Sequence, residues 1–351
     1  MVVASEAFAT QNRSFHMSDR VDEAQLKRLG ALHGWTATFF LLLGSALALF
    51  GQLATMVPRV ERWSSALMSL HGLIMVFLCW APGLSFSLAP LQRPTLHGAP
   101  AIKARWFSYV LYVAGATTIV ISAIAGGSRY GFRYYLCYFD RVHWATLGVT
   151  WGVALVALAM GVNGMLWLGY EKQAERAKCS TPFTTLLGVT GGVHVLVAPL
   201  ALSLALAISI EHRWKIGIFE PSLGGDPGLL PSLFWLYCQP ILMASALPVM
   251  GLIAETLARS SPDSSASPSI VVSRSQAVAI ATLCFLTWGT RAEVPFSEVT
   301  RNFFAFTGLS MLLVLGRPIV SAIAALGRAI PRSASTLSAS ALLLALAFGV
   351  L

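Results

Sequence analysis

The sequence predicts an all-α, polytopic membrane protein, a bundle of about nine transmembrane helices. Its 351 residues are 56% hydrophobic and only 11% charged, whereas soluble domains carry about a quarter charged residues. The mean hydropathy is +0.70, and apolar runs of about 20 residues, the length that crosses a bilayer, recur along the chain. Together these observations indicate an integral membrane protein without a soluble domain.

The chain divides into an N-terminal tail and a membrane bundle. Residues 1–30 contain acidic residues and no compact apolar core, which predicts a retained tail rather than a signal peptide. Within this tail, residues 18–30 are typical of a short amphipathic helix that leads into the first span. Residues 31–351 form the predicted bundle. Its spans are expected at 34–57, 63–91, 106–126, 142–170, 182–210, 231–257, 276–289, 303–327 and 333–351.

The distribution of basic residues predicts the orientation of the bundle. Most of the 24 Lys and Arg residues fall in the tail and in the connections that share its side of the membrane. This pattern places the N-terminus inside, in the cytoplasm of a bacterium or the matrix of a mitochondrion. The net charge of +9 therefore follows from topology, and no basic block indicates a nucleic acid partner.

The cysteines do not indicate a metal site. The five cysteines lie far apart, mostly within or beside apolar spans, and no two have the spacing of a ligand pair. We expect them to behave as small buried apolar residues.

Four sequence segments carry a family resemblance. The sixth span is preceded and opened by GGDPGLLPSLFWLYCQP (224–240), the second span contains LHGLIMVF (70–77), and HGAPAIKARW (97–106) follows it. Downstream, FLTWGTRAEV (285–294) leads into the eighth span. In this order the segments resemble subunit I of the haem–copper cytochrome oxidases. The resemblance implies the first part of that helix bundle, in the plasma membrane of a bacterium or the inner membrane of a mitochondrion.

The same resemblance implies that the copper site is absent. The family's histidine on the sixth helix, a copper ligand, corresponds to Gln239, although the proline that follows it is kept as Pro240. The two copper-binding histidines of the seventh helix correspond to Thr290 and Arg291. Copper at such a site needs imidazole nitrogens, and a guanidinium would repel the cation. We therefore expect no copper and no catalytic residue in this chain.

Two histidines remain as candidate haem ligands. His71 corresponds to an axial ligand of the family's low-spin haem, about 12 Å from the outer surface if the helix rises 1.5 Å per residue. It either binds haem iron or hydrogen-bonds to a neighbouring helix. His194, in the middle of the fifth span, is the weaker alternative ligand, and a packing or hydrogen-bonding role fits it better. The sequence ends within the segment that resembles the ninth helix, so we expect a degenerate relative without the family's tenth helix.

Three functions are compatible with these residues. The first is a non-catalytic subunit I-like component of a larger respiratory or electron-transfer complex, with other membrane subunits and an outer-side electron carrier as partners. The second is the front part of a split haem-containing oxidase or haem electron carrier that another chain completes. The third, a small-molecule or ion transporter, has less support because few ionisable residues lie within the spans.

Overall fold

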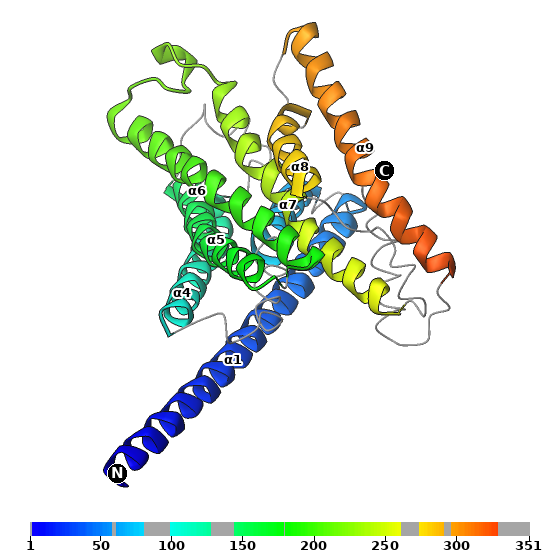
Figure 1. The fold of residues 1–351 in the computed structure, drawn as a ribbon. Helices are drawn as coiled ribbons and strands as arrows, with labels where there is room; N and C mark the ends of the chain where they lie inside the picture. The colour runs from blue at the N-terminus through cyan, green and yellow to red at the C-terminus, as the bar shows by residue number, and fades with distance from the viewer. Residues whose placement is uncertain are drawn as a thin grey trace.

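The computed structural model describes residues 2–57, 61–80, 99–127, 144–178, 180–260, 274–290 and 296–328. Every regular element in these ranges is helical (Figure 1). The long helices are α1 (Val2–Thr55), α2 (Glu61–Leu73), α4 (Ala99–Ser122), α5 (Trp144–Arg176), α6 (Pro182–Trp214), α7 (Leu229–Ser260), α8 (Arg274–Leu286) and α9 (Glu298–Arg328). The short elements are the π-helical η1 (Ile74–Trp80) and η4 (Ala123–Gly127) and the 3₁₀ turns η5 (Pro221–Leu223) and η7 (Trp288–Thr290).

The helices agree with a membrane bundle. Within the described ranges, five helical segments are long and apolar enough to cross a bilayer, namely Ala24–Thr55, Pro100–Ala125, Trp144–Arg176, Pro182–Trp214 and Leu229–Glu255. Ala66–Cys79 and Ser275–Leu286 are shorter apolar helices at the predicted second and seventh spans. The predicted ninth span, 333–351, lies outside the described residues. The count of about nine spans therefore stays a prediction.

The predicted tail helix and the first span form one continuous helix. α1 begins at Val2 and ends at Thr55, and Figure 1 shows it extending away from the other helices toward the N-terminus. Leu26 and Leu29 of the predicted tail helix are buried, so this part of α1 packs against the rest of the protein. The division of the chain at residue 30 stays a prediction.

The core of the bundle is built around α5, which packs against both α4 and α6. Glycines allow close approach on both sides. A Cβ at Gly152 would lie 2.8 Å from the carbonyl oxygen of Gly115 on α4, and one at Gly164 would lie 2.5 Å from that of Gly191 on α6. Trp167, between these helices, is fully buried. Small residues at helix contacts are the usual means by which membrane helices pack closely.

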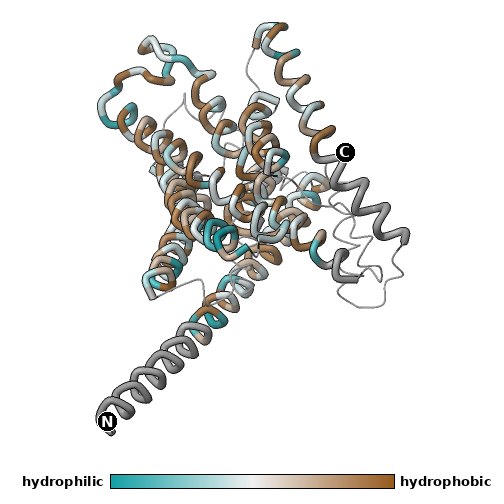
Figure 2. The backbone as a smooth tube through the Cα atoms, in the orientation of Figure 1, coloured by the Kyte–Doolittle hydropathy of each residue, from teal (hydrophilic) through white to brown (hydrophobic). Residues whose placement is uncertain are grey.

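The connection between α6 and α7 is organised by a buried carboxylate. Glu211, near the end of α6, accepts hydrogen bonds from the backbone N–H groups of Phe219 and Glu220, both at 2.8 Å. Gly224 adopts a φ of +87°, a left-handed conformation that glycine reaches without a Cβ clash. Asp226 then accepts a hydrogen bond from the N–H of Gly228 at 2.8 Å. The glycine-glycine-aspartate turn thus closes just before α7, and Figure 2 shows hydrophilic residues in this connection.

α7 continues as a helix through Pro240 and Pro248. A proline has no N–H, so Pro248 leaves the carbonyl of Ala244 without its partner in the helix. The hydroxyl of Thr190 on α6 lies 2.8 Å from that carbonyl oxygen and donates to it. A neighbouring helix therefore repairs the hydrogen bond that the proline removes.

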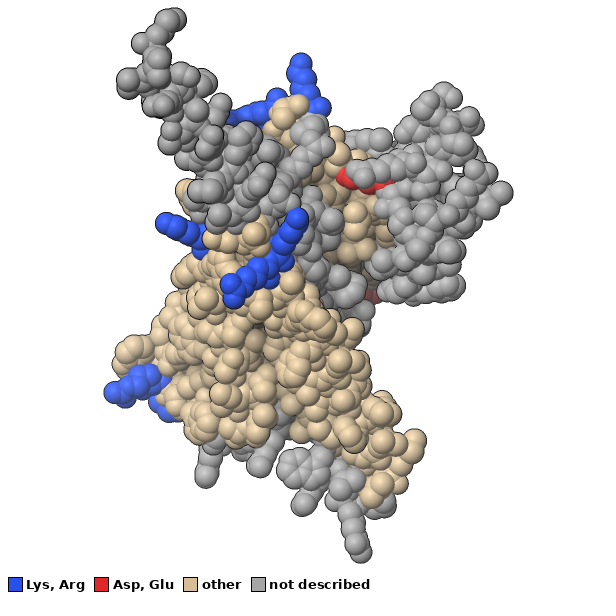
Figure 3. Space-filling model, turned by 90° about the horizontal axis from the view of Figure 1, so that it is seen from below, with Lys and Arg blue, Asp and Glu red and all other residues tan. Residues whose placement is uncertain are grey.

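The surface of the described residues suits contact with lipid. Large apolar side chains of α1, α4 and α9 are exposed, including Trp35, Phe107 and Phe306. On the face drawn in Figure 3, Lys and Arg appear at a few places, and most of the described surface is uncharged. A bilayer hydrocarbon core is the solvent in which such a surface is stable.

Candidate functional site

His71 lies near the end of α2 and is half-buried against α1. Its Nδ1 lies 2.9 Å from the carbonyl oxygen of Gly44 on α1. Because a carbonyl oxygen only accepts, Nδ1 must carry the proton and donate it. In the neutral form of the ring, the lone pair then lies on Nε2. A hydrogen bond from Nδ1 to a carbonyl is the arrangement that orients histidine for metal binding through Nε2.

Two matching contacts hold α2 against α1. The first is the bond from His71 to Gly44. In the second, the hydroxyl of Ser64 donates to the carbonyl oxygen of Gly51 at 3.0 Å. Ser64 lies seven residues before His71 on α2, and Gly51 lies seven residues after Gly44 on α1. A Cβ at Gly44 would lie 2.7 Å from the Sδ atom of Met75, and a Cβ at Gly51 would lie 2.9 Å from that of Met68. The two glycines therefore bring the backbones close enough for their carbonyls to be reached from α2.

The segment that follows His71 is fixed by aromatic packing. Phe77 of η1 is fully buried and stacks on Tyr237 of α7, with ring centroids 6.0 Å apart and planes 4° apart. The hydroxyl of Tyr112 on α4 donates to the carbonyl oxygen of Leu78. In a π-helix, each carbonyl accepts a hydrogen bond from the N–H group five residues later, and short π-helical segments are frequent at functional sites. This packing ties the end of the His71 helix to α4 and α7.

His194 occupies a different environment, at the contact between α5 and α6. It is 1% exposed, and its ring centroid lies 6.0 Å from that of Trp167 in an edge-to-face arrangement. One turn earlier on α6, Thr190 makes the contact to α7 described above. His194 is thus enclosed by protein, and a role as haem ligand stays a prediction.

The positions that correspond to the family's copper ligands are only partly described. Gln239 is buried on α7, whereas Thr290 is exposed on η7, where its hydroxyl donates to the carbonyl oxygen of Thr287 at 2.8 Å. α7 and η7 contact each other. Arg291 lies outside the described residues, so the meeting of all three positions stays a prediction. The carboxamide of Gln239 and the hydroxyl of Thr290 do not fit copper, which prefers imidazole or sulfur ligands.

Within the part of the chain that the structure describes, no group of three or more His, Cys, Asp and Glu residues has a metal-binding arrangement. Cys238 and Cys284 are free and buried, and Cys79 is free and half-buried. These three cysteines therefore occupy the environments expected for small apolar residues.

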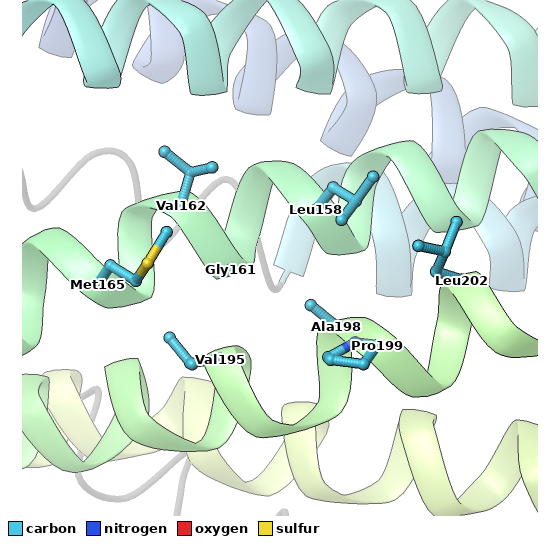
Figure 4. Close-up of a pocket in the computed structure, with 8 residues that line it drawn as sticks. All are labelled: Leu158, Gly161, Val162, Met165, Val195, Ala198, Pro199 and Leu202. Carbon is cyan, nitrogen blue, oxygen red and sulfur yellow. The ribbon is translucent and has the colours of Figure 1, made fainter.

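An apolar groove lies between α5 and α6. It has a volume of about 220 Å³ and is lined by Leu158, Gly161, Val162, Met165, Val195, Ala198, Pro199 and Leu202 (Figure 4). Without charged or hydrogen-bonding side chains, this lining has no group that could perform catalysis.

Asn163 is among the buried polar residues that were not predicted from the sequence. Asn163 on α5 is 1% exposed and lies in an apolar span, one turn before Trp167. The signal in the sequence was a single amide side chain among apolar residues and glycines. Placing a polar side chain inside a membrane span costs free energy unless it is paired, so such a residue indicates a specific contact.

Comparison with known proteins finds a matching family model and several related proteins. The family model described as "Cytochrome C and Quinol oxidase polypeptide I" matches residues 28–351. The "Probable cytochrome c oxidase subunit 1-beta" of Nocardia farcinica is 29% identical over 66% of this chain and 42% of the relative. The "Probable cytochrome c oxidase subunit 1-alpha" of Streptomyces coelicolor is 27% identical over the same shares. The "Cytochrome c oxidase subunit 1" of Synechocystis is 28% identical over 62% of this chain and 42% of the relative. The chain thus spans less than half the length of these curated relatives.

Proposed function

Because the chain belongs to the cytochrome c and quinol oxidase polypeptide I family, we propose that it is a non-catalytic membrane subunit of a larger respiratory or electron-transfer complex. In this role it keeps the family's helix packing but has no copper centre. Its partners are other subunits of the complex and an electron carrier on the outer side of the membrane, and its N-terminus lies inside.

The observation that carries this proposal is the set of side chains at the copper-ligand positions. Gln239 supplies a carboxamide, Thr290 a hydroxyl and Arg291 a guanidinium. A carboxamide and a hydroxyl are weak copper ligands, and a fixed positive charge repels the cation. The segment HGAPAIKARW resembles a turn in which the family has an aspartate for proton uptake, and the corresponding residue here is Ala101, which has no titratable group. The scaffold is thus retained without the groups that reduce oxygen.

The experiment is purification of the full chain with its native partners in lipid nanodiscs. We expect stoichiometric partner subunits, less than stoichiometric copper by elemental mass spectrometry, and no oxygen consumption that depends on this chain. One copper per chain, beyond the copper that the partner subunits hold without this chain, would overturn the proposal. A monodisperse lone monomer would count against the complex, because a structural subunit should remain with its partners.

A second candidate function, a haem electron carrier completed by another chain, is favoured by the tautomer of His71. The Nδ1–H donates to the Gly44 carbonyl, so Nε2 is the atom that would hold haem iron. A haem bound there supplies one-electron transfer to or from the outer-side carrier. The chain's own contribution would be to fix the imidazole plane through Gly44 and to hold the group through His71 Nε2, and a partner chain would supply the further ligand.

A pyridine haemochrome assay on the purified complex separates the two functions. Stoichiometric haem, with absorbance bands that His71→Ala shifts or removes, supports the electron carrier. A reduced-minus-oxidised difference spectrum without haem bands removes it and leaves the structural subunit. Because the partners could also contain haem, the comparison is made between the wild-type complex and the His71→Ala complex at equal partner content.

A further inference from the structure

The apolar groove of Figure 4 lies at the middle of two membrane-spanning helices. Its lining residues come from α5 and α6, and both helices are long and apolar enough to cross a bilayer. Pro199 lies in the middle of α6, which runs for 33 residues from Pro182 to Trp214. Because Pro199 and Met165 are exposed, the groove is not filled from within the described bundle. At this depth a bilayer offers hydrocarbon, with neither water nor lipid headgroups.

Pro199 leaves one backbone carbonyl of α6 without its partner in the helix. In an α-helix the carbonyl of Val195 accepts from the N–H group four residues later, and a proline has none. Val195 and Pro199 both line the groove, and the proline ring lies against the carbonyl four residues before it. Within the described residues, side chains donate to the α6 carbonyls of Leu186 and Ala205, but not to that of Val195. An unsatisfied acceptor thus borders the groove.

A second proline of the chain shows how a membrane helix satisfies such a carbonyl. Pro248 of α7 frees the carbonyl of Ala244, and the hydroxyl of Thr190 on α6 donates to it at 2.8 Å. That donor comes from inside the chain, because α6 packs against α7. At Pro199 the facing helix is α5, whose groove residues have apolar side chains or none. The corresponding donor must therefore come from a segment beyond the described residues.

The chemistry of the groove selects its occupant. The free carbonyl oxygen has a partial negative charge, so its complement is an O–H or N–H group. A lipid acyl chain fits an apolar lining but has no donor, and the backbone N–H groups of a transmembrane helix are already paired. A serine or threonine side chain on such a helix supplies a hydroxyl at this depth. A Cβ at Gly161 would lie 3.0 Å from that of Ala198, so the base of the groove is formed by small residues, as in other close contacts of membrane helices.

We propose that the groove between α5 and α6 is the docking site for a transmembrane helix of a partner subunit, which places a serine or threonine hydroxyl against the Val195 carbonyl. This inference rests on the proposed function, because a membrane complex is what supplies the partner. It adds the surface at which that partner binds and the hydrogen bond that selects it. Pro199 gives the specificity, since a helix without a donor at this level leaves the carbonyl unpaired.

The test is photo-crosslinking within the purified complex in lipid nanodiscs. p-Benzoylphenylalanine replaces Met165 in the groove or, as the matched control, Leu309 on α9; these side chains are 57% and 56% exposed. We expect the probe at position 165 to form an adduct with a membrane-spanning peptide of one partner chain, and that peptide to contain serine or threonine. The probe at position 309 should not label the same peptide.

The other outcomes contradict the proposal in distinguishable ways. A complete complex in which the probe at position 165 labels only lipid, a second copy of this chain or another segment of this chain would overturn the docking site and leave the proposed function standing. Purification of a lone monomer would count against both, because no partner would then be present.

An interchain double-mutant cycle tests the hydrogen bond. Pro199→Ala restores the N–H group for the Val195 carbonyl, and replacing the crosslinked serine or threonine by alanine removes the donor. We expect either change to raise the dissociation of the partner about threefold, the typical effect of one hydrogen bond between membrane helices, and both together to do no more. Pro248→Ala, where the donor is internal, is the control and should leave dissociation unchanged.

Additive effects of the two changes, or unchanged dissociation in Pro199→Ala, would overturn the assigned hydrogen bond. If Pro199→Ala does not fold, the crosslinks from position 165 still decide whether a partner helix occupies the groove.

Discussion

The imidazole of His71 donates through Nδ1 to the carbonyl oxygen of Gly44 across 2.9 Å, from α2 to α1. The hydroxyl of Ser64 donates to Gly51 in the same way at 3.0 Å. In each pair, a side chain of α2 reaches a glycine carbonyl of α1, and the pairs are seven residues apart on both helices. The orientation of His71 is thus part of a repeated contact and depends on how closely the two helices approach.

Gly44→Val should crowd the contact of α1 with η1, directly after the His71 helix α2. The added Cβ would meet Met75 Sδ at 2.7 Å and Met75 Cγ at 3.1 Å, and overpacking of this kind costs about 1–3 kcal/mol of unfolding free energy. We expect a lower unfolding temperature in lipid. Gly34→Val on the same helix is the matched control, because a Cβ there meets nothing within 4 Å. Equal destabilisation by both variants would show that helix propensity, not the α1–η1 contact, determines the effect.

His71→Ala should have one of two distinct outcomes. Without haem, the variant loses the hydrogen bond to Gly44, which costs about 1 kcal/mol, and the visible spectrum does not change. With haem bound through Nε2, the variant loses the axial ligand and the absorbance bands shift or disappear. His71→Asn, whose amide can still donate to a carbonyl, should recover part of the stability and none of the haem absorbance. Full haem content with unchanged bands in both variants would exclude His71 as a ligand.

Thr190→Val should destabilise the contact between α6 and α7. The substitution removes the donor to the Ala244 carbonyl, and leaving a buried acceptor unsatisfied costs about 1–3 kcal/mol. The same hydroxyl lies 2.9 Å from the Leu186 carbonyl of its own helix. The exposed Thr118 makes only such a contact within its helix, so Thr118→Val is the matched control and should have little effect.

A double-mutant cycle isolates the role of Pro248. Pro248→Ala restores a backbone N–H that can reach the Ala244 carbonyl, so the cost of Thr190→Val should fall in that background. Unfolding free energies of the wild type, both single variants and the double variant give the coupling energy. Simple additivity of the two substitutions would contradict the proposed repair.

Glu211→Gln should loosen the connection between α6 and α7. The carboxylate accepts from Phe219 N–H through one oxygen and from Glu220 N–H through the other. A carboxamide has a single acceptor oxygen, so one of these charge-assisted bonds, worth about 1.5–3 kcal/mol, is lost. Hydrogen exchange of the Phe219 and Glu220 amides should become faster. Glu220→Gln alters a half-buried side chain that accepts a hydrogen bond from the hydroxyl of Ser222, and it should leave this exchange unchanged.

The helix positions could be predicted from the sequence because a bilayer imposes a length on apolar segments. The segments predicted at 106–126, 142–170, 182–210 and 231–257 all fall on helices of the structure. The continuity of α1 could not be predicted, since nothing in residues 18–34 shows whether the tail helix ends before the first span begins. Helix ends depend on caps and tertiary contacts that a hydropathy pattern does not contain.

The candidate site could be predicted only as far as single residues. His71 was identified by a resemblance, but its bond to Gly44 depends on the register of two helices, which the sequence does not specify. The seven-residue spacing of Gly44 and Gly51, and of Ser64 and His71, is visible in the sequence. It indicates a helix contact only once the structure pairs the histidine and serine side chains with the two glycine carbonyls.

The pairing of α1 with α2 has a consequence for biosynthesis. Only residues 56–60 separate these helices, so they can enter the bilayer as a helical hairpin while the ribosome is still translating α4. Every atom that orients His71 through Gly44 is already present in that hairpin. The imidazole can therefore be presented correctly at the earliest stage of membrane insertion, before the rest of the bundle closes around it.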